Sequence, residues 1–459
     1  MGLRTVSTCS MDGRCSGFRI RGHGRGTIVL ATAGGRSRWG VDGTGRGVND
    51  SRPWGVQVGV LTTPHGGRLV SLCVQRDRAA ELRAAAGGWP SWQLTPRQTF
   101  DLELLATGGF SPLQTFLGHD DYVSVCESMR LSDGTLWPMP VTLDVPDHVV
   151  ASAEVSGSLA LRDSAADLIA VLHLVESWRP DRETEAKLVF GTTDPAHPSV
   201  DHLLRRTHSW YVSGKLEVLR LPEHGDFPQL RHTPSQLREE FSRRGWHRIV
   251  AFNTRNPMHR AHQELTLRAA VEANAKLLIH PVVGLTKPGD VDRSTRVRCY
   301  QAILPSYPQG DAMLSLLPLA MRMGGPREAL WHAIIRKNYG ASHFIVGRDH
   351  AGPSPDANGR PFYQPYDAQA LVRQHEAELG VTVMTFRQLV YLEDSQTYVP
   401  DHEVPPGART RSVSGTQLRR WLADGRDIPE WFTPAAVVAE LRRAYPARSD
   451  QGAAAPAPV

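Results

Sequence analysis

The sequence predicts an α/β protein in which a parallel sheet with helices on both faces follows a β-rich domain. Two observations support this fold class. From about residue 226 to 385, apolar runs of strand length alternate with helical patterns, which is typical of a parallel sheet. From 64 to 225, short alternating runs such as Val141–Val145 and Leu159–Asp163 lie between Gly, Pro and Asp turns, which favours strands. At 459 residues and 41% hydrophobic, the chain is long enough for two or three domains.

The elements of the central part are predicted in a regular order. They are strand Ile249–Phe252, helix Pro257–Ala273, strand Lys276–Val283, a helix to about Ala302 capped by Asp292 or Ser294, helix Pro326–Tyr339, strand His343–Val346, helix Asp367–Leu379 and strand Val381–Phe386. Ligands bind parallel sheets of this kind at the carboxyl ends of the strands. Residues 253–256 and 347–351 each follow a strand, so we expect them to face one crevice.

The two ends of the chain differ in composition from the middle. Residues 1–63 hold nine Arg, three Asp and 14 of the 41 Gly, which predicts a disordered Gly/Arg-rich extension. Their charge of +6 leaves about −1 for the other residues, so the net charge of +5 does not indicate a nucleic-acid partner. A basic RNA-binding tail and a start codon upstream of the native one are alternatives for this stretch. Residues 386–447 are predicted as a small C-terminal α/β domain, in which Ser414 or Thr416 caps helix Gln417–Ala423, and 448–459 as a flexible tail.

The segment after the first central strand carries the chemistry. Asn256 and Pro257 are typical of a helix start, because Asn caps free amides and Pro fits the first helical turn. His259 and His262 then lie on one face of that turn. Together with Arg255 they form a positive helix end, which suits a polyphosphate.

Other interpretations of the His pair exist. Such a pair is often a solvated face or part of a core, and it can be half of a zinc site. His280 and His350 could complete a zinc site, but no Cys or carboxylate lies at a supporting spacing. The strand, loop and helix around the pair favour phosphate.

Residues 253–262, Asn-Thr-Arg-Asn-Pro-Met-His-Arg-Ala-His, resemble the Gln-Thr-Arg-Asn-Pro-x-His-x-x-His signature of the sulfate adenylyltransferase (ATP sulfurylase) family. Further similar blocks are 94–98, 108–112, 133–137, 280–290, 320–328 and 338–352, so the resemblance runs from about Pro64 to about Tyr445. It implies a barrel-like, PUA-like domain over 64–225 and a Rossmann-like nucleotidyltransferase domain over 226–385. No Gly-x-x-x-x-Gly-Lys-Ser/Thr motif occurs, so we expect a single-function form without a fused adenylylsulfate kinase.

The reaction that the resemblance implies is transfer of AMP from MgATP to sulfate, giving adenylyl sulfate and pyrophosphate by direct in-line attack. Sulfate is ionised at neutral pH, so no general base is required. Catalysis then depends on positioning and on neutralising the charge of the leaving group. We expect Mg²⁺ to arrive on the phosphates of ATP, without a dedicated protein site.

The resemblance implies a role for each residue that matches a site residue of the family. Sulfate is expected to contact Arg255, Asn253 and the backbone N–H of Ala351. Residues assigned to catalysis are Thr254, Arg255, Asn256, His259 and His262. Residues assigned to ATP are Asn253, Thr254, Arg255, Asn256, Gly347, Arg348, Asp349, His350 and Leu389. Lys287 and Phe386 are candidates for closing over the substrates.

Asn253 departs from the family, which has Gln at this position. The amide is kept but its reach is shorter by one methylene, about 1.5 Å. We expect weaker sulfate binding with intact ATP binding. The alternatives are an adenylyltransferase for another oxyanion, or a catalytically weakened nucleotide-binding paralogue.

Composition also limits where the protein acts. No apolar run approaches the ~18 residues of a membrane span. The five cysteines are odd in number and scattered, which argues for a reducing compartment: Cys9, Cys15, Cys73, Cys126 and Cys299. We expect a cytoplasmic protein and a homo-oligomer, with ATP and sulfate as small-molecule partners.

Overall fold

The computed structural model of the chain describes residues 60–286 and 290–446, together with four short strands nearer the N-terminus. The four strands pair as two antiparallel ribbons: β1 (Val6–Cys9) with β2 (Cys15–Phe18), and β3 (Val29–Thr32) with β4 (Gly35–Arg38). They belong to a unit of their own, Met1–Val58, and every other element belongs to the unit that begins at Gly59. The expectations for Lys287, for the tail 448–459 and for most of the extension 1–63 lie outside the described residues.

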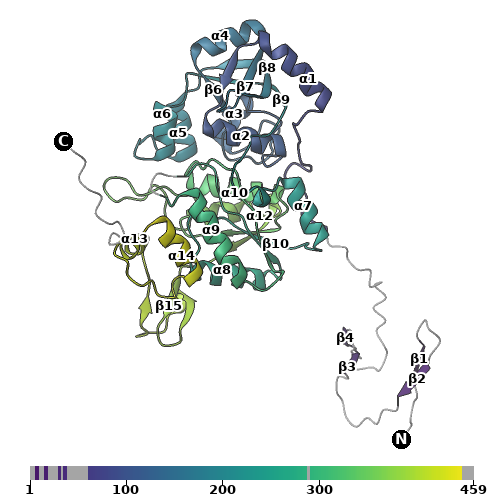
Figure 1. Cartoon of the computed structure of the whole chain (residues 1–459), viewed down its shortest axis with the longest axis vertical. Helices are drawn as coiled ribbons and strands as arrows, with labels where there is room; N and C mark the ends of the chain where they lie inside the picture. Colours follow the sequence, from purple (N-terminus) through teal and green to yellow (C-terminus); the bar gives the residue numbers. More distant parts are fainter. Residues whose placement is uncertain are drawn as a thin grey trace. The chain divides into compact units, whose positions relative to one another are not determined.

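The part from residue 60 to 225 contains a five-stranded sheet in the order β5-β7-β8-β9-β6. Its strands are β5 (Ser91–Gln93), β6 (Leu143–Val145), β7 (Ser158–Arg162), β8 (Leu168–Trp178) and β9 (Trp210–Val218). All neighbours are antiparallel except β5 and β7, which are parallel. Around them lie more helices than the alternating pattern predicted: α1 (Arg76–Ala85), α2 (Pro96–Thr107), α3 (His119–Ser128), α4 (Asp147–Ser156), α5 (Arg182–Phe190) and α6 (Pro198–Arg205) (Figure 1).

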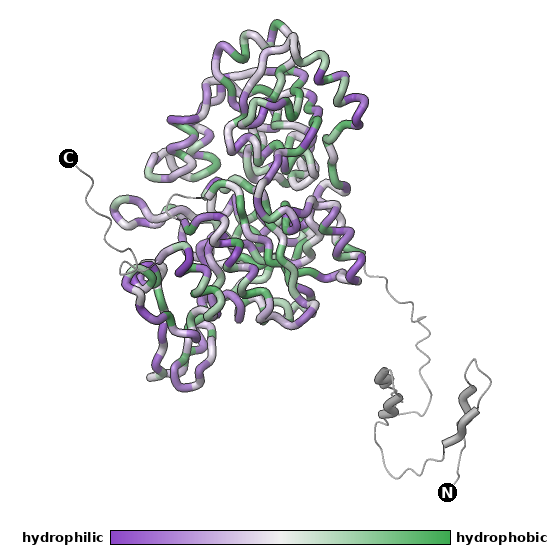
Figure 2. The backbone as a smooth tube through the Cα atoms, in the orientation of Figure 1, coloured by the Kyte–Doolittle hydropathy of each residue, from purple (hydrophilic) through white to green (hydrophobic). Residues whose placement is uncertain are grey.

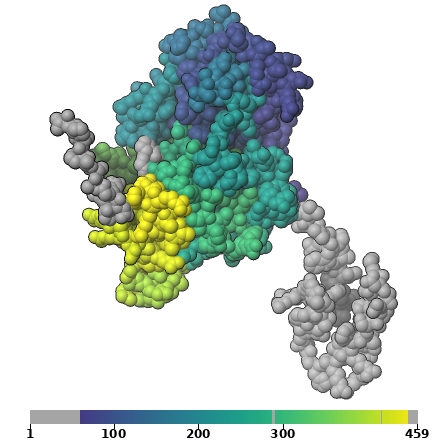
Figure 3. Space-filling view, in the orientation of Figure 1, coloured from purple at the N-terminus to yellow at the C-terminus, as the bar shows by residue number. Residues whose placement is uncertain are grey.

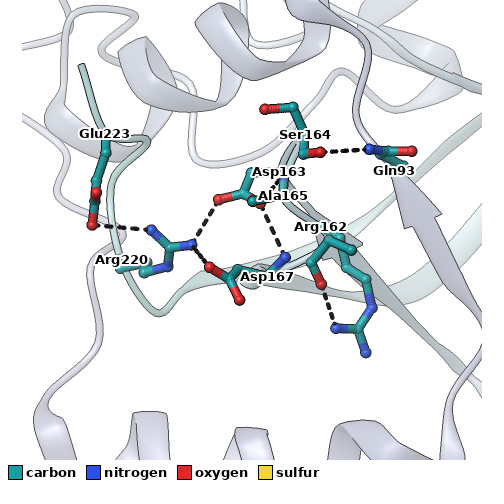
Figure 4. Close-up of polar contacts among 9 residues, drawn as sticks. Gln93, Arg162, Asp163, Ser164, Ala165, Asp167, Arg220 and Glu223 are labelled. Atoms are coloured by element: carbon teal, nitrogen blue, oxygen red, sulfur yellow. Dashed lines mark hydrogen bonds and ion pairs between the residues drawn. The ribbon is translucent and has the colours of Figure 1, made fainter. Parts of the chain in front are cut away.

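An ion-pair network holds the turn between β7 and β8 (Figure 4). Asp163 accepts backbone N–H bonds from Ala165 and Asp167, which closes the turn. Arg220, just past the end of β9, then reaches both carboxylates, at 2.6 Å from Asp163 and 2.9 Å from Asp167. The network therefore ties the β7–β8 hairpin to the segment that leaves this sheet.

The central part is a five-stranded parallel sheet in the order β12-β11-β10-β13-β14, which confirms the predicted fold class. Its strands are β10 (Ile249–Phe252), β11 (Lys276–Ile279), β12 (Ala312–Leu314), β13 (His343–Val346) and β14 (Thr382–Thr385). The chain leaves β10 towards β11 on one side and places β13 on its other side. That reversal of strand order is where open α/β sheets form their binding crevice.

Helices cover both faces of this sheet: α8 (Arg260–Glu272), α9 (Arg293–Ile303), α10 (Gly325–Asn338), α11 (Asp367–Gln374) and α12 (Glu376–Leu379), with α7 (Pro234–Arg243) preceding β10. All four residues of β10 are buried, and they divide by face. Ile249 and Ala251 pack in one apolar cluster with α10, whereas Val250 and Phe252 pack in the other with α8 and α9. Figure 2 shows the apolar stretches gathered where the strands lie and the polar ones along the outer helices and loops.

Several predicted boundaries are wrong. The helix expected from Pro257 begins at Arg260, and the strand expected to reach Val283 ends at Ile279, beyond which Val282 makes only an isolated bridge. The helix expected over 367–379 is two helices, because the backbone breaks at His375. The three-residue edge strand β12 was not predicted, since a run this short has no readable period.

The last part is a three-stranded antiparallel sheet with two helices. It comprises β15 (Leu389–Leu392), β16 (Thr397–Pro400), β17 (Thr410–Arg411), α13 (Gly415–Ala423) and α14 (Ala435–Ala444). Ser414 caps α13 as predicted, with its hydroxyl accepting the Gln417 N–H. Leu418 and Leu441 join the same apolar cluster as Tyr300 of α9, and Figure 3 shows the yellow C-terminal residues seated against green central ones. Short 3-10 turns among the described residues are Ala86–Gly88, Pro228–Leu230, Leu304–Ser306 and Asp401–Glu403.

Candidate functional site

Arg255 lies in the loop that leaves β10, and three neighbours hold its side chain. Nη1 lies 2.8 Å from the sulfur of Met323, and Nη2 donates to the carbonyl of Gly352 at 3.4 Å. Nε forms an ion pair with Asp290 at 3.5 Å. Because Gly352 lies past the end of β13, this contact brings together the two strand-end loops, as the sequence predicted.

Thr254 and Asn256 form a tight turn before the helix. The Thr254 hydroxyl accepts the N–H of Asn256 and donates to its carbonyl, both at 3.1 Å. That carbonyl also accepts from the Tyr300 hydroxyl at 3.0 Å. These bonds turn the Asn256 backbone aside, which is why Asn256 does not cap the helix. Its side chain remains exposed.

His259 and His262 occupy the start of α8, as the N-cap and the third helical residue. The backbone N–H of His259 donates to Nδ1 of His262 at 3.1 Å, so a neutral His262 carries its proton on Nε2. The two rings have centroids 5.8 Å apart. The predicted pairing at one helix end is therefore present, although the helix begins three residues later than predicted.

The C-terminal part holds the His259 ring. Phe432 stacks on it with centroids 4.6 Å apart, and the Thr433 hydroxyl lies 2.9 Å from its Nδ1. The N–H of Arg260 donates to the Phe432 carbonyl at 3.0 Å. Neither Phe432 nor Thr433 was predicted at the site, because nothing local in the sequence connects them to residue 259.

Burial sets the protonation of both rings. It lowers the pKa of His259 to about 3 and that of His262 to about 4, with the neighbouring ring adding to the effect at His259. Both imidazoles are therefore neutral at pH 7 in the free protein. They can donate hydrogen bonds to an anion, but they do not bring full positive charges to it.

The loop after β13 is shaped by a residue with unusual backbone geometry. Ala351 is buried with φ of 54°, in the left-handed region that favours glycine, and its carbonyl accepts from Gly325 N–H at 3.2 Å. Among the described residues the Ala351 N–H donates no hydrogen bond to a backbone carbonyl. Gly347 has open space where a Cβ would stand. Both features leave room and a free donor for a ligand.

The side chains of this loop point in different directions. Arg348 donates to Gln388 at 3.0 Å, and Asp349 is 66% exposed. His350 turns inwards instead, with Nε2 lying 3.0 Å from Nδ1 of His332, whose own Nε2 lies 3.3 Å from Glu328. Burial lowers the pKa of His350 well below its usual value. A nucleotide contact at His350 would therefore come from its backbone rather than from its ring.

Leu389 and Phe386 lie near this loop. Leu389 begins β15 directly after Gln388, the residue that bonds Arg348. Phe386 follows the last residue of β14, and its carbonyl accepts from Gln369 at 3.2 Å. The same Gln369 amide donates to Val346 at 3.0 Å, which joins the carboxyl ends of β13 and β14.

Asn253, directly after β10, contacts a buried arginine. Its Oδ1 accepts from Nη2 of Arg336 on α10. The same guanidinium nitrogen donates to the carbonyl of His280 at 3.1 Å. The sequence offered no sign of Arg336 at the site, since it lies in the last turn of α10, 83 residues away from Asn253.

Room beside the loop is provided by a cavity of about 440 Å³ lined by residues that include Arg348, Asp349, Gly352 and Tyr363. Gly325 borders it with φ of 51°, and a Cβ there would come within 2.3 Å of the Tyr363 ring. Among residues 60–286 and 290–446, no cluster of three His, Cys, Asp or Glu could hold a metal ion, so the zinc alternative has no ligand set in this part.

Comparisons with known proteins show the family of this chain. A family model described as ATP-sulfurylase matches residues 228–444, and one described as a PUA-like domain matches 62–221. The sulfate adenylyltransferase of Emericella nidulans is 54% identical over 398 residues, covering 86% of this chain and 69% of the relative. The chain belongs to the ATP-sulfurylase family. The sulfate adenylyltransferase of Schizosaccharomyces pombe is 53% identical over 374 residues, covering 81% and 76%.

A solved structure shares the fold. It is described as a hexameric APS kinase from Thiobacillus denitrificans, with a TM-score of 0.70 and 33% identity, covering 84% of this chain and 69% of that one. The family and fold class predicted from the sequence are thereby confirmed, including a PUA-like domain before the ATP-sulfurylase domain. No described helix is both long and apolar enough to cross a membrane.

Proposed function

We propose that this protein is a sulfate adenylyltransferase, which transfers AMP from MgATP to sulfate and releases pyrophosphate. The observation that carries the proposal is the contact of Arg255 with the Gly352 loop, because it gathers the family's two signature loops at the switch point of the sheet. The 54% identity to a curated sulfate adenylyltransferase supports the same reaction.

In this reaction an oxygen of sulfate attacks the α-phosphorus of ATP. A new bond joins that oxygen to phosphorus, and the bond from the α-phosphorus to the bridging oxygen breaks, so that pyrophosphate leaves. No proton moves, since sulfate is already ionised. The protein therefore has to bring two anions together and hold them in line.

We assign sulfate to Arg255, Asn253 and the Ala351 N–H. Arg255 offers a planar fork suited to an oxyanion, and Met323, Asp290 and Gly352 hold it in place. The Ala351 N–H donates to no backbone carbonyl in the described chain. Preorganised donors of this kind lose little energy to reorganisation when the anion arrives.

We assign the leaving phosphates to His259 and His262. Their neutral rings can donate from Nε2, while Nδ1 of each is already bonded, to Thr433 and to the His259 backbone. As charge develops on pyrophosphate, these N–H donors can hydrogen-bond to it without a proton transfer. Thr254 and Asn256 lie one turn earlier, where the α-phosphate would meet them.

The nucleotide is assigned to Gly347, Arg348, Asp349, the His350 backbone and Leu389. The open space at Gly347 and the cavity beside Arg348 and Asp349 support this assignment. Mg²⁺ enters as part of MgATP, since this ion commonly keeps most of its water and binds through substrate phosphates.

The test is pyrophosphate release from ATP with sulfate, selenate, molybdate or no added anion. Sulfate should give adenylyl sulfate, and molybdate should give continuous release because its adenylyl product hydrolyses. His259→Ala and His262→Ala should each lower kcat with sulfate by about 100-fold. The exposed His402 serves as control, with His402→Gln retaining full turnover. Release that never depends on any oxyanion would refute the assignment.

A second function is favoured by one observation, the shortened Asn253 side chain tied to Arg336. If a larger oxyanion gains more from this geometry than sulfate does, kcat/KM in the same panel will be higher for that anion. A chain that binds ATP but is silent with every anion would instead be a nucleotide-binding regulator.

Three further properties belong to the proposal. We propose a homo-oligomer, since one similar solved structure is described as hexameric, and light scattering after gel filtration tests it. We propose a cytoplasmic location, supported by free thiols at Cys73, Cys126 and Cys299. We propose domain limits at 64–225, 226–385 and 386–447, which limited proteolysis would test.

A further inference from the structure

Arg336 is a fully buried cation directly behind the proposed acceptor site. It lies on α10 with 0% exposure, and its Nη2 bonds both Asn253 Oδ1 and the His280 carbonyl. These two acceptors follow the ends of the neighbouring strands β10 and β11. The guanidinium therefore lies beneath the carboxyl edge of the sheet, where the strand-end loops begin.

The charge of Arg336 has no carboxylate partner within 4.0 Å in the described chain. Its Nε and Nη1 have no hydrogen-bond partner there either, and its Cζ lies 5.7 Å from the centre of the Phe344 ring. Burial lowers the pKa of Arg336 to about 9, so it is still protonated at neutral pH. Tyr339 and Glu328 offset part of the cost of burying this charge, and an anion that binds nearby would reduce the cost further.

The contact with Asn253 has only one possible polarity. A guanidinium carries donors and no acceptor, so the amide atom that faces it must be oxygen. Nδ2 of Asn253 therefore points away from Arg336. Asn253 is partly exposed, and its Nδ2 has no acceptor among the described residues, so the amide is free to donate to a ligand in the loop.

We propose that Arg336 is a positioning residue for the acceptor anion: it orients the Asn253 amide so that Nδ2 donates to the anion, and it adds positive potential behind that bond. The inference rests on the proposed function, since sulfate is the anion in question. The competing explanation is that Arg336 only joins the ends of two strands. In that case its loss would affect stability, or both substrates equally.

Asn253→Asp tests the donor role of the Asn253 amide, and Arg336→Met separates the two explanations. Aspartate has the same shape, so its carboxylate can pair with Arg336 and keep the fold, but it neutralises the guanidinium and has no N–H to donate. We expect the melting temperature to be unchanged or higher. The apparent KM for sulfate should rise about tenfold or more, with the KM for ATP within about twofold.

Arg336→Met should raise the sulfate KM selectively in the same way, and adding Asn253→Ala to it should have little further effect, since the two residues act together. Arg238→Met is the matched control: Arg238 is a partly buried arginine on α7 that also donates to a backbone carbonyl, that of Thr62. It should leave both KM values unchanged. If Arg336→Met does not fold, the sulfate KM of Asn253→Asp is compared with that of Asn253→Ala instead.

The outcomes also separate this inference from the proposed function. A wild-type protein without sulfate-dependent pyrophosphate release refutes the function itself. A wild-type protein that is active, with an Asn253→Asp variant whose sulfate KM is unchanged or whose ATP KM rises equally, overturns the role of Arg336 alone. So would strictly additive effects of Arg336→Met and Asn253→Ala on sulfate KM.

Discussion

The hydroxyl of Thr433 lies 2.9 Å from Nδ1 of His259, which is 174 residues earlier in the chain. The same stretch stacks Phe432 on the imidazole. The C-terminal part thus fixes the orientation of a ring that we assign to the leaving phosphates. A ring held at Nδ1 presents Nε2 in a constant direction, which preorganised catalysis requires.

Thr433→Val should lower kcat because it removes this hydrogen bond without changing the volume much. One such bond corresponds to roughly 1 kcal/mol, or about a fivefold decrease in sulfate-dependent turnover. The measurement is pyrophosphate release at saturating ATP and sulfate. Thr433→Ser keeps the hydroxyl and should retain most of the activity. Equal loss in both variants would mean that packing rather than the hydrogen bond matters.

Asn253→Gln restores the family residue and should lower the apparent KM for sulfate, with the KM for ATP unchanged. The longer side chain reaches about 1.5 Å further towards the anion. Steady-state kinetics with each substrate varied in turn would measure both constants. An unchanged sulfate KM would show that the side chain of residue 253 does not contact the acceptor anion. The control is Gln388→Asn, which shortens an amide that contacts Arg348 and should affect ATP more than sulfate.

Acidification should destabilise the protein through His259 and His262. Burial lowers the pKa of His259 to about 3 and of His262 to about 4, whereas both titrate near 6.5 when unfolded. Between pH 6.5 and 4 the unfolded state thus binds protons that the folded state does not. The free energy of unfolding falls as pH falls, by about 1.4 kcal/mol per pH unit for each group.

Urea unfolding at several pH values measures this slope. His262→Gln keeps a neutral side chain but removes one titrating group, so its slope should be shallower by one proton. Contributions from the carboxylates are common to both proteins and cancel in the comparison. A variant with the wild-type slope would show that His262 is protonated when folded.

Arg322→Met should be strongly destabilising, because Arg322 and Asp101 form a buried ion pair at 2.5 Å. Losing Arg322 removes the direct partner of the buried Asp101 carboxylate, at about 3–5 kcal/mol. The free energy of unfolding at pH 7 would show it. Replacing both partners, as in Asp101→Leu with Arg322→Met, should recover much of the loss. A double variant as unstable as the single one would assign the effect to packing.

The parallel sheet and its two loops could be predicted from the sequence because they rest on local signals. Apolar runs such as Ile249–Phe252 and His343–Val346 have the length of buried strands, and their alternation with helices restricts the topology. Parallel strands share one carboxyl edge, so residues 253–256 and 347–351 had to meet there. The observed contact joins Arg255 to Gly352, the residue directly after 347–351.

Local signals failed where a side chain competes for the backbone. Asn256 and Pro257 are typical of a helix start. However, the Asn256 N–H donates to the Thr254 hydroxyl, and the Asn256 carbonyl accepts from the Tyr300 hydroxyl. The helix therefore begins at Arg260. Tyr300 lies 44 residues away, so the residues around Asn256 in the sequence could not indicate this hydrogen bond.

Fold class, family and the meeting of the two strand-end loops could be inferred from the sequence alone, since periodicity and motif spacing are properties of neighbouring residues. Three relationships became visible only in the folded chain: Arg336 lies behind Asn253, Thr433 holds His259 and the His350 ring faces the core. Those relationships join residues 18 to 174 positions apart. These contacts form when helices and strands pack together, and no local sequence pattern specifies which buried donor will bond which acceptor.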